Sequence, residues 1–289
     1  MLSDETPTDP PIGDSSRGSP LEGRKDFSRL GVRMISAFVI APVVIAATYF
    51  GEPYFFLMIA AAAALMAMEW AALVGARPPA ALILAIASGL AVSLAYAAGP
   101  RYSILVLVFV ATLFSIRRAH ESVGRWMAAG TVYIGLPCSV FVWLRDMPDG
   151  GLTTVAWLFA VAWVTDTGAY LFGRAVGGPK LAPKLSPNKT WAGLLGGMAC
   201  AGAAGGVMGL FLRVENTLCF VVASIVIGGI SQGGDLFESR VKRRFDKKDS
   251  GAFMPGHGGI LDRVDGLLAA IVFAGLLEWA TDGSWRPWV

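Results

Sequence analysis

The sequence predicts an all-α integral membrane protein with about nine transmembrane helices, a cytosolic N-terminus and a C-terminus on the outer side. The mean hydropathy is +0.58 and only 16% of the 289 residues are charged, too few to cover a soluble domain of this size. Apolar runs of about 17–25 residues, the length of a membrane-crossing helix, recur along the chain. These runs are uniformly apolar rather than alternating, which disfavours transmembrane strands.

The first 30 residues precede these runs and are rich in Asp, Glu, Pro, Gly and Ser, as in TPTDPPIGDSSRGSPLEG. They contain too few apolar side chains to build a core, so residues 1–30 are expected to form a disordered cytosolic tail. A cleaved signal peptide is not expected, because the apolar run that follows is long and no small-residue cleavage site closes it.

Nine apolar spans are expected after the tail. Their approximate limits are Met34–Phe50, Pro53–Val74, Ala80–Ala98, Tyr102–Ile116, Trp126–Leu144, Leu152–Phe172, Trp191–Leu212, Leu218–Gly234 and Asp265–Ala280. About five of them lie in an N-terminal transmembrane region, residues 31–150. The others lie in a C-terminal transmembrane domain, residues 151–289, which also contains two polar cytosolic loops at 173–190 and 235–264.

The basic residues predict the orientation of these spans. With a cytosolic N-terminus, only four of the 24 Lys and Arg residues lie on the outer side: Arg101, Arg145, Arg213 and Arg286. Because Lys and Arg accumulate in cytoplasmic loops, this asymmetry favours a cytosolic N-terminus and an outer C-terminus.

Acidic residues flank the longer loop, GGDLFESRVKRRFDKKDSGAFMPGHGGILDRVDG. Asp235 and Glu238 have i,i+3 spacing where one span ends, and Asp262 and Asp265 have the same spacing where the next begins. Carboxylates that converge repel one another unless a cation joins them. Oxygen ligands without a Cys or His cluster favour Mg²⁺, with a second hard cation such as K⁺ as a further option.

Basic residues and glycines lie between these acids. The basic and hydroxyl group comprises Ser239, Lys242, Arg243, Arg244, Lys247 and Lys248. Cations beside a metal site suit a polyphosphate whose charge shifts to a leaving pyrophosphate. The glycines Gly256, Gly258 and Gly259 let backbone N–H groups approach phosphate oxygens. The alternative for the basic run is attachment to anionic lipid, which requires neither acids nor glycines.

The shorter loop, GRAVGGPKLAPKLSPNKTWAG, predicts a helix N-terminus. Ser186 would cap the helix and Pro187 would occupy its first position. Exposed N–H groups there, with Lys189 and Thr190 in the first turn, would bind an anion. The alternative is an ordinary capped helix whose lysine extends to the membrane surface.

Three isolated titratable residues complete the set. Asp166 lies inside an apolar span, where a carboxylate is costly and usually functional, although a polar packing contact is the alternative. His257 is flanked by glycines in the longer loop and would bind a phosphate or orient an aspartate. Glu69, near the inner end of the second span, is given no role.

The order of these residues resembles a known family. The residues are Ser239, Val241, Lys242, Arg243, Lys248, Asp249, Gly251 and the run Pro255–Asp265, together with Asp166–Tyr170, Lys180–Pro183 and Ser186–Trp191. This pattern is similar to the signature of the phosphatidate cytidylyltransferases, also called CDP-diacylglycerol synthases. Met254, Asn188 and Ala192 depart from it.

The resemblance implies that residues 151–289 form a catalytic domain that converts CTP and phosphatidate into CDP-diacylglycerol and pyrophosphate with Mg²⁺. The implied location is the bacterial cytoplasmic (inner) membrane, with the active site facing the cytosol. The expected partners are therefore CTP, phosphatidate and the lipid bilayer. No nucleic acid is expected, and a homodimer is left open.

The resemblance also implies roles for individual residues. Asp235 and Asp262 would be the metal ligands. The phosphates would be held by Ser239, Lys242, Arg243, Arg263, Lys189, Ser186 and Thr190. Residues that shape the loop or assist catalysis would be Lys248, Asp249, His257, Asp265 and Asp166.

Three other functions fit parts of this pattern. A CTP-dependent kinase of polyprenol or phytol would keep the phosphate apparatus but release CDP rather than pyrophosphate. A CDP-alcohol phosphotransferase would carry a D-G-x-x-A-R motif, which is absent from the sequence. A transporter would distribute its acids along several spans near the midplane, whereas these acids gather at one face.

Overall fold

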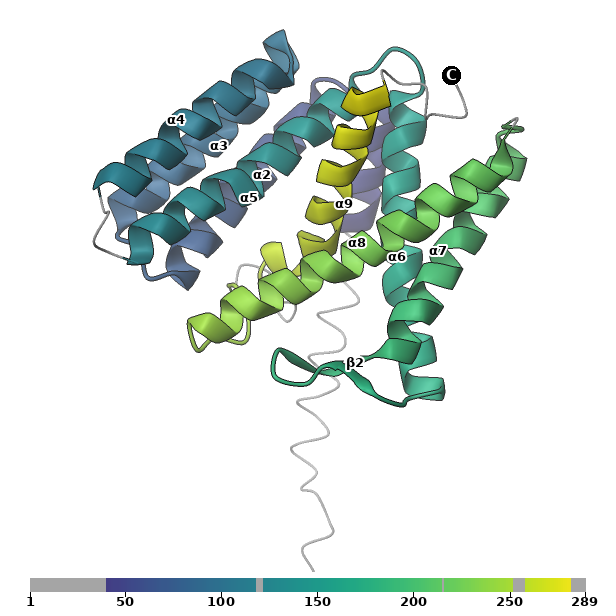
Figure 1. Cartoon of the computed structure of the whole chain (residues 1–289). Coiled ribbons are helices and arrows are strands. Elements are labelled where there is room, and N and C mark those ends of the chain that lie inside the picture. The colour runs from purple at the N-terminus through teal and green to yellow at the C-terminus, as the bar shows by residue number, and fades with distance from the viewer. Residues whose placement is uncertain (1–39, 118–121, 215, 252–257, 282–289) are drawn as a thin grey trace, which may run out of the picture.

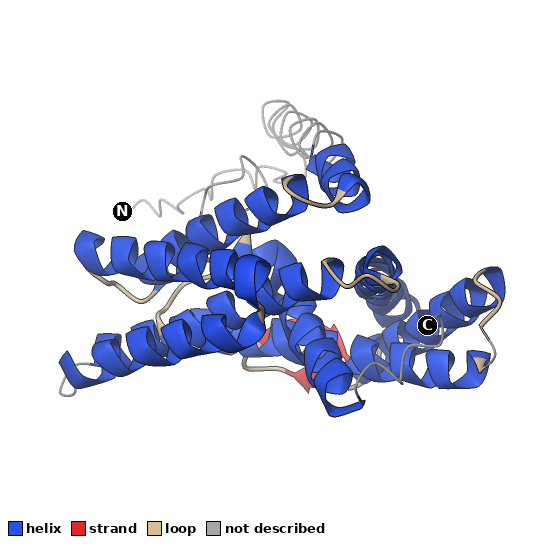
Figure 2. Ribbon diagram, turned by 90° about the horizontal axis from the view of Figure 1, so that it is seen from above, coloured by secondary structure: helices blue, strands red, loops and turns tan. Residues whose placement is uncertain are grey.

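The structure is a computed structural model and describes residues 40–117, 122–214, 216–251 and 258–281. Within these ranges the chain is almost entirely helical (Figures 1 and 2). A helix described over Ile40–Phe50 is followed by α2 (Tyr54–Leu73), α3 (Pro78–Ala98), α4 (Pro100–Arg117), α5 (Ser122–Arg145), α6 (Gly151–Ala175), α7 (Trp191–Phe211), α8 (Thr217–Arg244) and α9 (Leu261–Thr281). Two short strands, β1 (Lys180–Ala182) and β2 (Ser186–Thr190), join α6 to α7.

Seven of these helices, α2, α3 and α5 to α9, are long and apolar enough to cross a membrane. Two shorter apolar helices cover Ile40–Phe50 and Pro100–Ile116. The expected all-helical membrane architecture is therefore confirmed. Residues 1–39, which contain the expected tail, lie outside the described residues.

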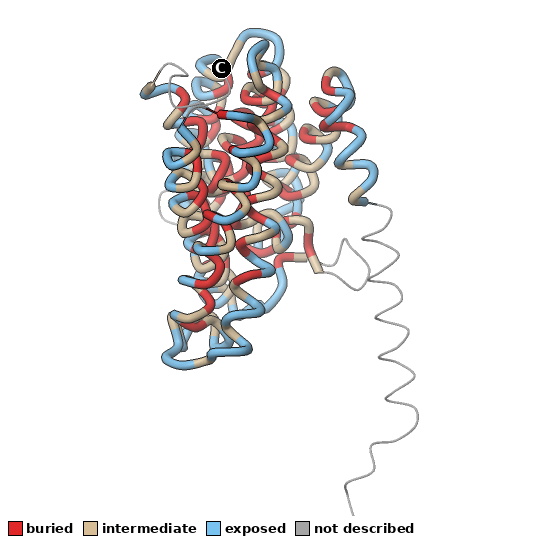
Figure 3. Tube along the Cα trace, turned by 90° about the vertical axis from the view of Figure 1, so that its right-hand side faces the viewer, coloured by how far each residue is buried: buried red, intermediate tan, exposed pale blue. Residues whose placement is uncertain are grey.

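Large apolar side chains cover the outside of the bundle. Leu210, Phe211 and Trp279 are 71%, 86% and 80% exposed. Figure 3 shows buried and exposed positions alternating along the helices around a buried interior. Such a surface would be a liability in water but suits a lipid environment, where hydrocarbon is the solvent.

The helices form two groups that meet at α8 and α9. In the first group, α2 and α4 pack against α3 and α5, and in the second, α7 packs between α6 and α8. Helix α9 contacts both α5 and α8, so it joins the two groups. Each group of helices contains a buried tryptophan whose indole N–H has a hydrogen-bond partner. Trp70 Nε1 donates to Trp126 O at 2.8 Å, and Trp157 Nε1 donates to Ser224 Oγ at 2.9 Å.

Helices α8 and α9 cross closely because each has a glycine at the contact. A Cβ atom on Gly234 would lie 2.7 Å from Asp265 O, and one on Gly266 would lie 2.9 Å from Ser231 O. The crossing therefore brings Asp235 and Asp265 to the same junction. It occurs well inside α8, which continues to Arg244. The expectation that a loop begins at Asp235 is thus wrong, because a run of good helix formers extends the helix past the apolar segment.

The connection from α6 to α7 is a β-hairpin, and not a helix start at Ser186. Strands β1 and β2 are antiparallel, with Lys180 opposite Thr190 and Ala182 opposite Ser186. Helix α7 begins only at Trp191, with Thr190 as its cap: Thr190 Oγ1 accepts from Gly193 N at 3.0 Å. The Ser-Pro pair was misread because proline is equally compatible with an edge strand. Figure 1 shows the hairpin and the C-terminal end of α8 at the same end of the molecule.

Candidate functional site

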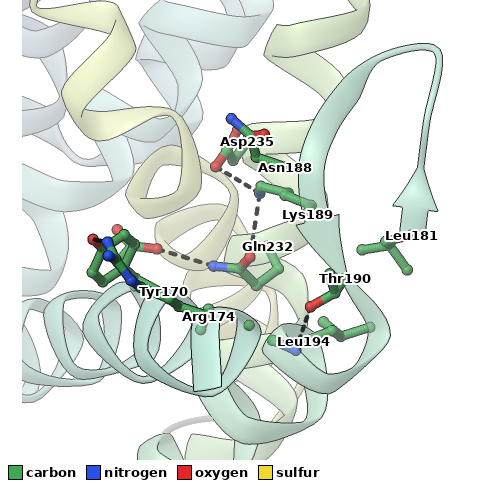
Figure 4. Close-up of a pocket in the computed structure, with 13 residues that line it drawn as sticks. Tyr170, Arg174, Leu181, Asn188, Lys189, Thr190, Leu194, Gln232 and Asp235 are labelled. Atoms are coloured by element: carbon green, nitrogen blue, oxygen red, sulfur yellow. Dashed lines mark hydrogen bonds and ion pairs between the residues drawn. The ribbon is translucent and has the colours of Figure 1, made fainter. Parts of the chain in front are cut away.

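A pocket of about 580 Å³ opens between α6, the hairpin, the start of α7 and α8 (Figure 4). Its polar lining includes Asp166 from α6, Lys189 and Thr190 from β2, and Gln232 and Asp235 from α8. These residues come from segments far apart in the sequence. The pocket confirms that the shorter polar loop and the start of the longer one lie together.

A chain of polar contacts crosses this pocket. Lys189 Nζ lies 2.6 Å from Asp235 Oδ2 and donates to Gln232 Oε1 at 3.2 Å. Figure 4 shows the dashed lines from Lys189 to Asp235 and to Gln232. Gln232 Nε2 in turn donates to Asp166 Oδ1 at 3.0 Å. The intramembrane carboxylate of Asp166 therefore has a defined partner and faces the pocket. A lysine fixed between the carboxylate of Asp235 and the amide oxygen of Gln232 is a suitable group to meet phosphate oxygens.

Gln232 was missed by sequence reasoning. Its side chain is buried and joins Lys189 to Asp166, so it carries the contact between α6 and β2. A signal was present in the sequence, because an amide inside an apolar span one turn before Asp235 needs a polar partner.

A second polar cluster lies where α8 ends and α9 begins. Lys242 Nζ donates to Asp262 Oδ1 at 2.7 Å. The same carboxylate accepts from Ser250 N, at 3.1 Å to Oδ1 and 3.0 Å to Oδ2, and from Gly259 N at 2.9 Å. Asp262 thus organises the backbone on both sides of residues 252–257.

The α8–α9 crossing connects this cluster to the pocket. Asp265 interacts electrostatically with Asp235 on the pocket side and with Glu238 and Lys242 on the other. Ser239 Oγ lies 3.4 Å from Asp235 Oδ1. Asp235 and Asp262, which were expected to share a metal, belong to different sets of contacts within the described part of the chain: Asp235 contacts Lys189 and Ser239, and Asp262 contacts Lys242 and the backbone.

Glu238 is the least satisfied group at the junction. Its side chain is fully buried and interacts with the Asp265 carboxyl group, and no amide, hydroxyl or ammonium group among the described residues donates a hydrogen bond to either of its oxygens. The Lys242 ammonium lies 3.6 Å from Oε2. A buried carboxylate without a full set of partners has room for a further cationic or protonated neighbour.

No group of three or more His, Cys, Asp or Glu side chains is arranged to hold a metal ion within the ranges that the structure describes. The available donors nevertheless suit Mg²⁺. They are hard carboxylate oxygens beside the buried Glu238, and Mg²⁺ usually takes one or two carboxylates plus substrate phosphates.

The remaining predicted residues lie around these two clusters. Arg243 ties the hairpin to α8, because its Nε donates to Leu185 O at 3.4 Å and its Nη1 to Lys247 O at 3.2 Å. Lys248, Asp249 and Arg263 are exposed at the same end of the molecule. Ser186 lies in β2 and Thr190 caps α7. His257 lies outside the described residues.

Glu69 has a role that sequence reasoning did not give it. It is buried near the end of α2, and its carboxylate accepts from Ile260 N and Leu261 N, each at 2.9 Å. No role was assigned to it from the sequence, and the structure gives it this one. Nothing local in the sequence of α2 reveals this, because the partners lie at the start of α9.

Comparison with known proteins identifies the family of the chain. The family model described as "Cytidylyltransferase family" matches residues 31–279. The chain belongs to the cytidylyltransferase family. The family match covers both helical groups and every predicted site residue, so the N-terminal helices are as much part of the family fold as the polar C-terminal half.

Individual members of the cytidylyltransferase family show the same relationship. A phosphatidate cytidylyltransferase of Brucella suis is 40% identical over 246 residues, which cover 84% of this chain and 91% of the relative. One of Staphylococcus saprophyticus is 41% identical over 146 residues, 50% of this chain and 55% of the relative. One of Bacillus subtilis is 35% identical over 173 residues, 60% of this chain and 64% of the relative.

Proposed function

We propose that this protein transfers the cytidylyl group of CTP to phosphatidate, giving CDP-diacylglycerol and pyrophosphate. The observation that carries the proposal is the Lys189–Asp235 ion pair, which lies in a pocket at one end of the helical bundle. The chain is also 40% identical to a phosphatidate cytidylyltransferase, over 91% of the length of that relative. A pocket at the end of such a bundle suits an enzyme that takes one substrate from the membrane and the other from water.

The reaction makes one P–O bond and breaks another. A phosphate oxygen of phosphatidate attacks the α-phosphorus of CTP, and the bond from that phosphorus to the β-phosphate oxygen breaks as pyrophosphate leaves. The attacking phosphate is already anionic, so no strong base is required. The main difficulty is to bring two anions into line, which positioned cations can overcome.

The residues of the pocket and of the α8–α9 junction bind different phosphate groups in the proposed reaction. Lys189, held by Asp235 and Gln232, points its ammonium at the pocket and binds phosphate oxygens. Lys242 and Arg243 add positive charge about two turns beyond Asp235 on α8, where the leaving pyrophosphate would gather. The α7 N-terminus, capped by Thr190, faces the same pocket with its partial positive charge.

Asp235 and Asp262 are the residues that would hold Mg²⁺, with Asp265 between them and a second hard cation such as K⁺ as a further option. When bound, the metal would screen the phosphate charges and polarise the P–O bonds. Asp235 pairs with Lys189 and Asp262 pairs with Lys242, so each acid has a cation beside it.

We also propose a nine-span topology with a cytosolic N-terminus, an outer C-terminus and the site facing the cytosol, in the bacterial inner membrane. The placement of basic residues supports it, because the hairpin and the end of α8 carry most of the positive charge of the C-terminal half and lie at one end of the bundle.

One experiment tests the reaction. Purified protein in detergent is supplied with phosphatidate, Mg²⁺ and CTP labelled with radioactive phosphorus at either the α or the γ position. The proposal predicts α-label in the lipid product and γ-label in pyrophosphate. Transfer of the γ-label to a lipid, with release of CDP, would instead identify a lipid kinase.

A further inference from the structure

The cytosolic end of α2 contacts the connection between α8 and α9 at several points. The central contact is Glu69, whose two oxygens each accept one backbone N–H, Oε1 from Ile260 and Oε2 from Leu261. These N–H groups lie at the start of α9, where no partner is available inside the helix. A carboxylate there satisfies both donors and also favours the positive end of the helix dipole.

Two glycines that flank residues 252–257, Gly251 before them and Gly259 after them, lie close to this same carboxylate. A Cβ atom on Gly251 would lie 2.9 Å from Glu69 Oε1, and one on Gly259 would lie 2.7 Å from Oε2. Only glycine allows the backbone to come so close at these two positions. A third contact holds the connection nearer α8, because Lys247 Nζ donates to Ala72 O at 2.6 Å.

The end of α2 is itself firmly fixed. Trp70, next to Glu69, is fully buried and donates its indole N–H to Trp126 O at 2.8 Å. Trp126 in turn makes an edge contact with Phe245 just after α8, with ring centroids 5.5 Å apart. The N-terminal helices therefore give Glu69 a fixed position relative to both ends of the connection.

The contact between Glu69 and the start of α9 also fixes the position of Asp262, the residue after Leu261. Its carboxylate accepts from Lys242 Nζ, Ser250 N and Gly259 N, and this geometry requires α9 to begin where it does. We infer that Glu69 is a positioning residue of the active site, which fixes the start of α9 so that Asp262 meets Lys242. Glu69 does not touch substrate. The inference uses the proposed function only to name the reaction that Asp262 serves.

The test is Glu69→Gln in the full-length protein in detergent, read by hydrogen exchange as well as turnover. The amide keeps the size of the side chain but turns an NH₂ group toward one of the two N–H donors. Backbone exchange in 258–264 should become at least about tenfold faster, as expected when a helix start loses its protection. Exchange in α6 and α7 should stay unchanged. The turnover number should fall at least about tenfold and the KM for phosphatidate should change less than about threefold, because alignment rather than lipid binding is lost.

Glu278→Gln is the matched control, because it makes the same change at a buried glutamate near the other end of α9. It should leave exchange in 258–264 and turnover as in the wild type. Unchanged exchange and turnover in Glu69→Gln would overturn the inference. Faster exchange throughout the protein would also overturn it, since Glu69 would then be a general stabiliser. If the wild type makes no CDP-diacylglycerol, the proposed function fails, and the exchange measurement still decides the role of Glu69.

Discussion

Lys189 and Asp235 form an ion pair with Nζ and Oδ2 2.6 Å apart, although Lys189 lies on strand β2 of the hairpin and Asp235 lies on α8. The pair joins the two polar segments of the chain at the pocket wall. Its side chains are 18% and 34% exposed, so it is neither fully solvated nor sealed. An ammonium held in this way is available to a phosphate without first having to be ordered.

Replacing Lys189 with methionine should therefore remove a phosphate-binding cation and leave Asp235 without its partner. We expect kcat/KM for CTP to fall at least about a hundredfold, a loss typical of a fixed group that stabilises charge in the transition state. The measurement is steady-state pyrophosphate release at varied CTP.

Lys184→Met is the control for this prediction, since Lys184 is an exposed lysine in the turn of the same hairpin. It removes the same charge without touching the pocket, so kcat/KM should stay within about threefold of wild type, as for most surface changes. Equal losses in the two variants would mean that the hairpin supplies only general positive charge.

Gln232→Leu should uncouple Asp166 from Lys189. The substitution keeps the approximate volume but removes the donor to Asp166 Oδ1, which leaves a carboxylate poorly satisfied inside the bundle. We expect a loss of about 1–3 kcal/mol in the free energy of unfolding, and a turnover about tenfold lower, which corresponds to about 1.4 kcal/mol of barrier. Unfolding in detergent and pyrophosphate release measure the two effects. Wild-type values in both would show that the contact has no consequence.

The α8–α9 crossing gives a sharp comparison between neighbouring glycines. Gly234→Ala places a methyl group against Asp265 O, so it should destabilise the protein by about 1–3 kcal/mol, in the range for overpacking, and lower turnover by moving Asp235 away from α9. Gly233→Ala meets nothing within 4 Å and should be neutral or slightly stabilising, because alanine favours helix. Thermal unfolding and turnover of both variants test this. The opposite order would contradict the close crossing.

The orientation of the protein can be read by cysteine labelling in intact cells. In a background without native cysteines, Lys184→Cys in the hairpin and Pro148→Cys between α5 and α6 are both exposed positions. An impermeant maleimide should label Pro148→Cys from outside and Lys184→Cys only after lysis. The reverse pattern would place the pocket on the outer face.

Much of this fold could be predicted because its main cause is local. Apolar runs of membrane length give helices whatever their neighbours, so α2, α3, α5 to α7 and α9 lie close to their expected limits, and α8 begins where expected although it continues to Arg244. The two polar loops were expected on the same side of the membrane, and the contact between Lys189 and Asp235 shows that they meet, although this pair itself was not predicted.

What could not be predicted depends on contacts between distant segments. Ser186 and Pro187 fit a helix start and a strand equally well, and only pairing with Lys180–Ala182 selects the strand. Glu69 reads as an acid that reaches for water, because its donors at Ile260 and Leu261 are far away in sequence. The separation of Asp235 and Asp262 into two sets of contacts depends on where α8 ends, which the apolar pattern does not mark.

The central claim is that the α8–α9 junction carries out cytidylyl transfer, and its most direct test is the rate of pyrophosphate release by Asp235→Asn, Asp262→Asn and the double variant at saturating Mg²⁺. Each asparagine keeps the size of the side chain but removes the charge. We predict that each single variant inserts normally and loses at least about a hundredfold in rate, because metal screening supplies several kcal/mol to such a transfer. The double variant should be little slower than either single variant, because in the proposed site both residues would hold the same Mg²⁺. Retention of most of the wild-type rate by Asp262→Asn would contradict the claim and reduce the junction to a connector between two spans.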